Sequence, residues 1–295
     1  MAHISTLIPD VQELLTTKDW FTESLANEFA HSLALRLREQ FASRTGPGTL
    51  RLSRMGPQCP CALWYSVRHP ELAERMPPWA ENKFSFGHMI EVWAITLAKA
   101  AGHTVEGEQD EVSVDGILGH RDCIVDGCLV DVKSAASRSF SKFKDGSLVH
   151  DDLFGYLDQL DGYLVGCLED PLVTVKDRGY LWAIDKQLGH MCLYEHLHTP
   201  SRKEQITSRI RHSKDIVRLR EPPPCECGTI TDEGSGNIRL DVRGSYNAYK
   251  YCCFPRLRTF IYSGGPEYFV KVVKPPRNKN GPLTEVDKHG KIVYN

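Results

Sequence analysis

In the stretch GHRDCIVDGCLVDVKS, the spacing of Asp122, Asp131 and Lys133 could bring two carboxylates and an ammonium together. Asp126-Gly127 is a strong signal for a two-residue hairpin turn, because a type I′ turn needs positive φ at both positions. With that turn, Asp122 lies opposite Asp131, and directly opposed Cβ atoms are about 4.5–5.5 Å apart. Lys133 projects from the same face as Asp131, since side chains alternate along a strand. The hairpin therefore predicts two carboxylates and an ammonium at one point.

This arrangement suits Mg²⁺ or Mn²⁺, hard cations that take carboxylate and phosphate oxygens. Such an ion can activate a water molecule and stabilise the developing charge on a phosphodiester. Lys133 could position or deprotonate that water, or neutralise the transition state. The alternative is a surface hairpin whose acidic side chains are simply solvated.

The hairpin resembles the motif of the PD-(D/E)XK nuclease superfamily. In that motif an acidic residue ends one strand and (D/E)-x-K lies on the next, which Asp122 and Asp131-Val132-Lys133 match. The resemblance implies that both aspartates and the Val132 carbonyl bind the metal, while Lys133 assists the attacking water.

Flanking residues extend the resemblance to the RecB-like and lambda-exonuclease-like branches. A helix before the hairpin carries Gly87-x-x-x-Glu91, which implies a further metal ligand at Glu91, with His88 on the same face. A later segment carries Gln159-x-x-x-Tyr163, whose i, i+4 spacing places both side chains on one helical face. There they could bind the scissile phosphate or orient Lys133. The whole chain most resembles phage-encoded exonucleases.

Several residues are candidates for DNA contact. Ser53 and Arg54 match the segment that enters the core in the same branch. The segment after Lys133 is expected to be a loop in which cations alternate with Phe140 and Phe143, a mixture suited to phosphate contact and base stacking. The alternative is a mobile, solvated loop. The candidates in this segment are Ser134, Arg138, Lys142 and Lys144.

The ten cysteines include a group near the C-terminus. Some members of the resembled branch carry an iron–sulfur cluster, whose first cysteine Cys59 or Cys61 matches, but Gly244 and Asn247 occupy the positions expected for a C-x₂-C pair. A zinc-type thiolate site is the other alternative, with the candidate ligands Cys225, Cys227, Cys252 and Cys253. The expectation is ordinary unligated thiols, with a colourless protein.

Patterns of apolar residues predict the elements that position these groups. Helices are expected at 19–44, 60–69, 82–101, 151–168 and 200–219, two or three strands within 111–133, and a hairpin around 187–189. The tail beyond residue 275 is polar and is expected to be loose.

Composition limits the class of protein. The chain has 295 residues, 41% hydrophobic and 25% charged, with a net charge of −2. These values exclude a collagen-like, coiled-coil or wholly disordered chain, and no apolar run approaches the roughly 18 residues of a membrane span. The N-terminal residues lack a signal-peptide pattern, so a reducing cytoplasm is expected, that of a bacterial host if the protein is phage-encoded.

Together these observations predict an α/β fold with a restriction-endonuclease-like core, a mixed sheet flanked by helices. The expected divisions are an N-terminal helical segment (1–48), a nuclease core (49–220) and a Cys-containing extension (221–295). The expected function is Mg²⁺-dependent exonuclease action on DNA ends, single-stranded or frayed, in phage replication, recombination or DNA degradation. The alternatives are a non-catalytic module that binds DNA or a replication protein, and an endonuclease.

Overall fold

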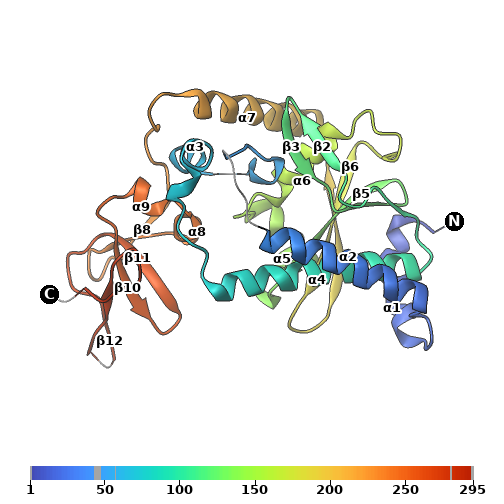
Figure 1. Ribbon diagram of the computed structural model, residues 1–295, viewed down its shortest axis with the longest axis horizontal. Helices are drawn as coiled ribbons and strands as arrows, with labels where there is room; N and C mark the ends of the chain where they lie inside the picture. Colours follow the sequence, from blue (N-terminus) through green and yellow to red (C-terminus); the bar gives the residue numbers. More distant parts are fainter. Residues whose placement is uncertain (1, 43–47, 57, 280, 294–295) are drawn as a thin grey trace. The chain divides into compact units, whose positions relative to one another are not determined.

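The computed structural model describes the chain except residues 1, 43–47, 57, 280 and 294–295. The chain forms two compact units (Figure 1). The first contains residues 1–46, 50–56 and 76–211, and the second contains residues 47–49, 57–75 and 212–295.

The first unit is built on a mixed five-stranded sheet with the order β1-β4-β5-β6-β7. The central pair, β5 and β6, is parallel, and the other neighbours are antiparallel. Parallel neighbours need a crossover connection, which here contains two helices, α5 and α6. The strands are β1 (Val105–Glu106), β4 (Cys123–Val125), β5 (Cys128–Ala135), β6 (Arg178–Asp185) and β7 (Met191–Leu197).

Helices cover both faces of this sheet, and β5 alternates between them. Leu129 and Ala135 join an apolar cluster with α5 (Ser137–Lys144) and α6 (Tyr156–Gly166). Val130 and Val132 join a second cluster with α1 (Leu7–Thr16) and α4 (Pro78–Ala100). Because side chains alternate along a strand, Asp131 and Lys133 share the α6 face with Leu129.

The hairpin register agrees with the one expected from the sequence. Cys123 pairs with Val130, and Val125 pairs with Cys128. Asp126 and Gly127 have φ angles of 50° and 77°, as a type I′ turn requires. The turn residues therefore set the register that brings Asp122 and Asp131 together.

The first unit also contains a separate hairpin of β2 (Glu111–Val114) and β3 (Ile117–His120), which packs on α6. The segment 111–133 thus holds four strands or parts of strands, where two or three were expected. The remaining elements are η1 (Ile4–Thr6), α2 (Glu23–Phe41), η2 (Leu52–Arg54), η4 (Ser147–His150) and α7 (Pro200–Arg218), whose last turns belong to the second unit.

The second unit is built on an antiparallel sheet with the order β14-β10-β11-β9-β8. Its helix α3 (Pro60–Arg68) begins with Pro60, a residue favoured in the first turn, and contacts α9 (Lys250–Cys253). The other elements are η3 (Pro70–Leu72), β8 (Thr229–Thr231), β9 (Ile238–Leu240), α8 (Val242–Tyr246), β10 (Arg258–Tyr262), β11 (Gly265–Lys271), β12 (Arg277–Asn278), β13 (Gly281–Pro282) and β14 (Glu285–Val286).

Two expectations about irregular segments were wrong. The segment after Lys133 is the helix α5 rather than a loop, because Phe140 and Phe143 lie three apart and are both buried in the first apolar cluster. The tail beyond residue 275 contains three short strands, and β14 pairs with β10 through Thr259 and Phe260. The polar composition of the tail does not indicate this pairing, because the partner strand is distant in the sequence.

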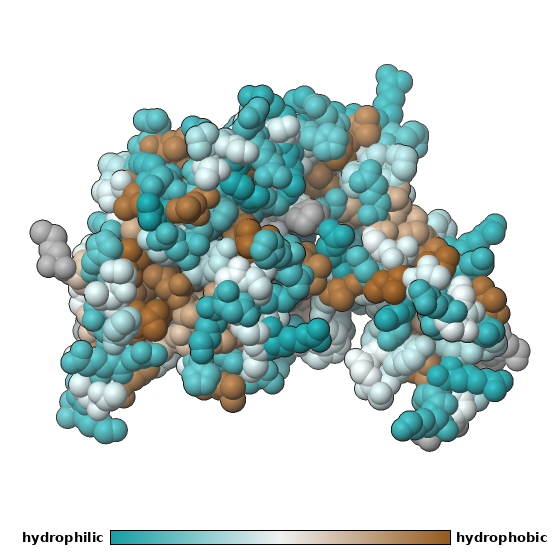
Figure 2. Space-filling view, turned by 180° about the vertical axis from the view of Figure 1, so that it is seen from behind, coloured by the Kyte–Doolittle hydropathy of each residue, from teal (hydrophilic) through white to brown (hydrophobic). Residues whose placement is uncertain are grey.

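The α/β class, the mixed sheet flanked by helices and the N-terminal helix are confirmed, and the C-terminal region holds cysteines that cluster. The division at residues 48 and 220 stays a prediction. No helix in the described part of the chain is long and apolar enough to cross a bilayer. The face drawn in Figure 2 is mainly hydrophilic, with scattered hydrophobic patches.

Candidate active site

The two aspartates of the hairpin occupy different environments. Asp131 is 2% exposed, whereas Asp122 is half-buried and its Oδ2 accepts a hydrogen bond from the Val132 N–H at 2.7 Å. Burial, followed by the charges of Glu91 and Asp131, raises the pKa of Asp122 well above its usual range. Burial also raises the pKa of Asp131, although Lys133 opposes that shift. The pair is therefore short of positive charge.

Lys133 lies beside Asp131, as the alternation along β5 predicts. Its Nζ is 2.5 Å from Asp131 Oδ2 and donates to Gln159 Oε1 at 3.2 Å. The same Nζ lies 4.8 Å from the ring centroid of Tyr156. Burial would lower the pKa of Lys133, but the charges of Asp131 and Asp122 outweigh it and raise that pKa above its usual range.

Helix α6 supplies the other polar groups of this face. Gln159 Nε2 donates to Asp131 Oδ1 at 3.1 Å and lies 3.3 Å from the Tyr163 hydroxyl. The i, i+4 spacing brings these two side chains together, and Tyr163 is 2% exposed. Burial and the Asp131 charge raise the pKa of Tyr163, which keeps its phenol protonated.

Glu91 approaches the pair from α4. Its Oε1 accepts a hydrogen bond from Gln109 Nε2 at 2.6 Å and lies 3.5 Å from Arg36 Nε. His88 Nδ1 is 3.8 Å from Glu91 Oε2. After burial, the charge of Glu91 is the next cause of the raised pKa of Asp122. Gln109 and Arg36 were not found from the sequence, because neither belongs to a motif.

The residues fit a divalent cation. Asp131 Oδ2 is buried and makes no hydrogen bond within the described part of the chain, although Lys133 lies beside it. Three carboxylates supply the oxygen ligands that Mg²⁺ and Mn²⁺ prefer. The ligands would be Glu91, Asp122 and Asp131; the part of the Val132 carbonyl stays a prediction.

A buried ion network holds α6 in place behind the site. Asp161, 0% exposed at its side chain, accepts hydrogen bonds from His196 at 3.0 Å and His198 at 2.6 Å. Arg202 Nε donates to Asp161 at 2.8 Å, and Arg202 also pairs with Asp158 at 2.9 Å. These contacts fix the helical turn between Gln159 and Tyr163. No sequence pattern indicated them, because His196 lies on β7, His198 just after it and Arg202 on α7.

The candidate DNA contacts are distributed over three elements. Ser53 and Arg54 are exposed in η2, and Ser134 is half-buried near the end of β5. Arg138 and Lys144 are exposed on α5, while Lys142 pairs with Asp151 at 2.5 Å. The expected base stacking on Phe140 and Phe143 does not hold, since both rings are buried in the core.

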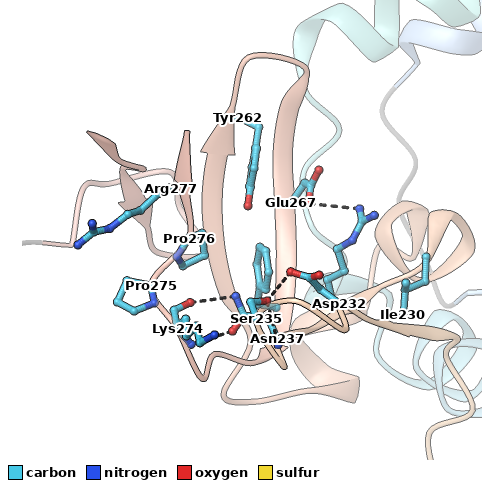
Figure 3. Close-up of a pocket in the computed structure, with 12 residues that line it drawn as sticks. Ile230, Asp232, Ser235, Asn237, Tyr262, Glu267, Lys274, Pro275, Pro276 and Arg277 are labelled. Carbon is cyan, nitrogen blue, oxygen red and sulfur yellow. Dashed lines mark hydrogen bonds and ion pairs between the residues drawn. The ribbon is translucent and has the colours of Figure 1, made fainter. Parts of the chain in front are cut away.

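A cavity of about 450 Å³ lies in the second unit (Figure 3). Two of its polar side chains have partners at the cavity: Arg239 pairs with Glu267 at 3.2 Å, and the Asn237 amide donates to the Lys274 backbone carbonyl at 2.9 Å. Tyr262 lines the cavity and stacks on Phe269. The cavity holds none of the carboxylates described above, which all belong to the first unit.

Four cysteines of the second unit also gather, with their Sγ atoms all within 4.8 Å of one another: Cys59, Cys225, Cys227 and Cys253. Cys252 and Cys61, both considered as ligands from the sequence, lie outside this group. Cys59 was expected only as the first ligand of an iron–sulfur cluster.

No family model matches the chain, and no curated protein matches it. Similar solved structures include the crystal structure of SSO0001, at 18% sequence identity and a TM-score of 0.40, which covers 63% of this chain and 85% of that one. An alkaline exonuclease, LHK-Exo from Laribacter hongkongensis, shows 14% identity and a TM-score of 0.39, covering 61% of this chain and 92% of that one. The same enzyme in complex with dAMP shows 12% identity and a TM-score of 0.38, covering 64% and 92%. These likenesses are distant, so the function proposed below rests on the residues of the site.

Proposed function

We propose that the chain hydrolyses phosphodiester bonds in DNA with the help of Mg²⁺ or Mn²⁺. The observation that carries this proposal is the connected polar set on one face of the sheet, in which Asp131, Lys133 and Gln159 contact one another directly. Asp122 and Glu91 add negative charge beside that set. A surface hairpin with solvated acids would have neither the burial of Asp131 nor these contacts.

Each residue has a role that follows from its placement. Glu91, Asp122 and Asp131 would hold the cation, which would supply the positive charge needed to polarise the phosphodiester and activate water. Lys133 is held by Asp131 and Gln159 where its ammonium can orient the attacking water and stabilise negative charge on the phosphate. Gln159 keeps Lys133 in position, and Tyr163 positions the Gln159 amide.

We further propose that hydrolysis starts at the ends of DNA. It rests on the resemblance of the ordered motifs Glu91, Asp122, Asp131-x-Lys133 and Gln159-x-x-x-Tyr163 to RecB-like exonucleases. The exposed cations Arg138 and Lys144 on α5, which follows β5 directly, are available for phosphate contact. DNA is therefore the proposed partner.

The test uses two DNA substrates of the same sequence, one linear and end-labelled, the other a covalently closed circle, with and without Mg²⁺. An exonuclease releases label from the linear DNA only when Mg²⁺ is present and leaves the circle intact. Nicking of the circle would instead show an endonuclease. Binding of DNA without any cleavage in Mg²⁺ or Mn²⁺ would contradict catalysis and show a non-catalytic binding module.

A further inference from the structure

Four cysteines from three separate segments of the second unit converge on one point. Cys59 caps the N-terminus of α3, Cys225 and Cys227 lie before β8, and Cys253 ends α9. Cys59 Sγ lies 3.7 Å from Cys225 Sγ, and all four sulfurs are within 4.8 Å of one another. Thiols separated by up to 194 positions in the sequence do not meet so closely by local geometry, so the fold itself brings them together.

Every one of the four sulfurs has an N–H donor directed at it. The Glu226 N–H points to Cys59 Sγ at 3.3 Å, and the Cys227 N–H points to Cys225 Sγ at 3.5 Å. The side-chain amide of Asn247 reaches both Cys227 Sγ at 3.3 Å and Cys253 Sγ at 3.4 Å. Such donors stabilise thiolates, and groups that hold the ligands in this way are typical of metal sites.

The spacing of the sulfurs indicates a single ion. Four thiolates about 2.3 Å from one zinc ion stand about 3.8 Å apart at the corners of a tetrahedron. In a four-iron cluster each thiolate binds a different iron atom, so the sulfurs lie farther apart than those that share one ion. The separations here therefore fit a mononuclear tetrahedral site and do not fit the iron–sulfur cluster that the resemblance implies for some members of the branch.

We propose that Cys59, Cys225, Cys227 and Cys253 bind one structural Zn²⁺ ion. Soft thiolate ligands in a closed tetrahedral set are the usual structural zinc site. The ion joins the start of α3 to the segments around β8 and α9, and so stabilises the second unit. Asn247 is a positioning residue that orients two of the ligands. The site does not depend on the proposed hydrolysis, because the carboxylates of that reaction lie in the first unit.

The test uses the full chain, expressed in medium that contains both iron and zinc and purified without oxygen. We expect about one zinc per chain by metal analysis and no visible absorption. Cys253→Ser and Cys59→Ser should lose the zinc and melt at a lower temperature. Cys252→Ser is the matched control, because Cys252 adjoins Cys253 but lies outside the cluster; it should keep both the zinc and the melting temperature.

A second measurement decides the matter even if those variants fail to fold. Removal of the metal from the wild-type protein with a chelator should lower its melting temperature, and one equivalent of Zn²⁺ should restore it. Iron with acid-labile sulfide, a Cys59–Cys225 disulfide, a wild-type protein without zinc, or equal loss of zinc in Cys252→Ser would each overturn the proposal.

Discussion

Lys133 gives different electrostatic environments to the two aspartates that face each other in the hairpin. Asp131 has an ammonium 2.5 Å from its Oδ2 and an amide donor from Gln159 at 3.1 Å. Asp122 accepts one backbone hydrogen bond, from the Val132 N–H at 2.7 Å, and burial followed by the charges of Glu91 and Asp131 raises its pKa. Without a metal ion, the uncompensated charge of the site therefore resides mainly at Asp122.

Asp122→Asn should stabilise the protein in metal-free buffer at neutral pH. The raised pKa means that the native state binds the proton of Asp122 more tightly than the unfolded state does, so ionisation costs stability at neutral pH. An asparagine removes that charge and its carbonyl can still accept the Val132 N–H. We expect Tm to rise by about 2–4 °C, the change produced by ~1 kcal/mol in a domain of 150–250 residues.

Lys133→Gln is the contrasting variant for this prediction. The charges of Asp131 and Asp122 raise the pKa of Lys133, so its ammonium is favoured in the native state, and its loss should lower Tm. Thermal melts in the presence of a chelator measure both changes. A fall in Tm for Asp122→Asn, or a rise for Lys133→Gln, would show that the charge is not distributed as described.

Gln159→Ala and Tyr163→Phe should slow cleavage without weakening Mg²⁺ binding. Gln159 joins Lys133, Asp131 and Tyr163 but is not a metal ligand in the proposed site. Loss of a hydrogen bond to a charged group costs about 1–3 kcal/mol, which is roughly a 5- to 150-fold fall in kcat/KM. Initial rates on linear DNA measure the loss, and calorimetry measures the Mg²⁺ affinity. Weaker Mg²⁺ binding by Tyr163→Phe would contradict this division of roles.

Strand β3 passes close to α6 at Gly119. A Cβ atom at Gly119 would lie 2.6 Å from Tyr163 Cε1 and 2.9 Å from Leu52 Cβ. Only a residue without a side chain lets the Tyr163 ring and η2 pack against this strand. The position of a phenol in the site thus depends on a glycine in a different hairpin.

Gly119→Ala should therefore destabilise the first unit and slow cleavage together. Overpacking of a core typically costs about 1–3 kcal/mol, and displacement of Tyr163 disturbs the Gln159 amide. Gly162→Ala is the matched control, because its Cβ would meet neighbours only at 3.8 Å and 4.0 Å and alanine favours a helix. Denaturant unfolding and initial rates compare the two. If Gly119→Ala has the same unfolding free energy and the same cleavage rate as the wild type, the close packing is refuted.

Two features of these elements could be predicted from the sequence because each depends on residues close together in the chain. The Asp126-Gly127 turn fixes the hairpin register, and the i, i+4 spacing fixes the shared face of Gln159 and Tyr163. Helix α5 was missed because its two phenylalanines were interpreted as partners for DNA, whereas burial against the sheet sets their role. Contacts that join distant segments, such as Gln109 with Glu91, leave no local pattern and could not be predicted.

The two clusters of polar and metal-binding residue types belong to different units of the molecule. The carboxylates, Lys133 and the α6 residues belong to the first, while the four clustered cysteines belong to the second. Sequence spacing suggested a thiolate site of Cys225, Cys227, Cys252 and Cys253, but Cys59, 166 positions before Cys225, takes the place of Cys252. Adjacent residues on a helix point in different directions, so one of the two neighbouring cysteines necessarily turns away.

The measurement that tests the proposed hydrolysis most directly compares the wild type with Asp131→Ala and Lys133→Ala on linear DNA in Mg²⁺. Asp215→Ala serves as the control, since Asp215 is an aspartate that is 72% exposed on α7. Circular dichroism establishes that all the variants are folded. We predict that the wild type and Asp215→Ala release nucleotides at equal rates and that the two site variants release none. Digestion by folded Asp131→Ala at the wild-type rate would contradict the proposed site.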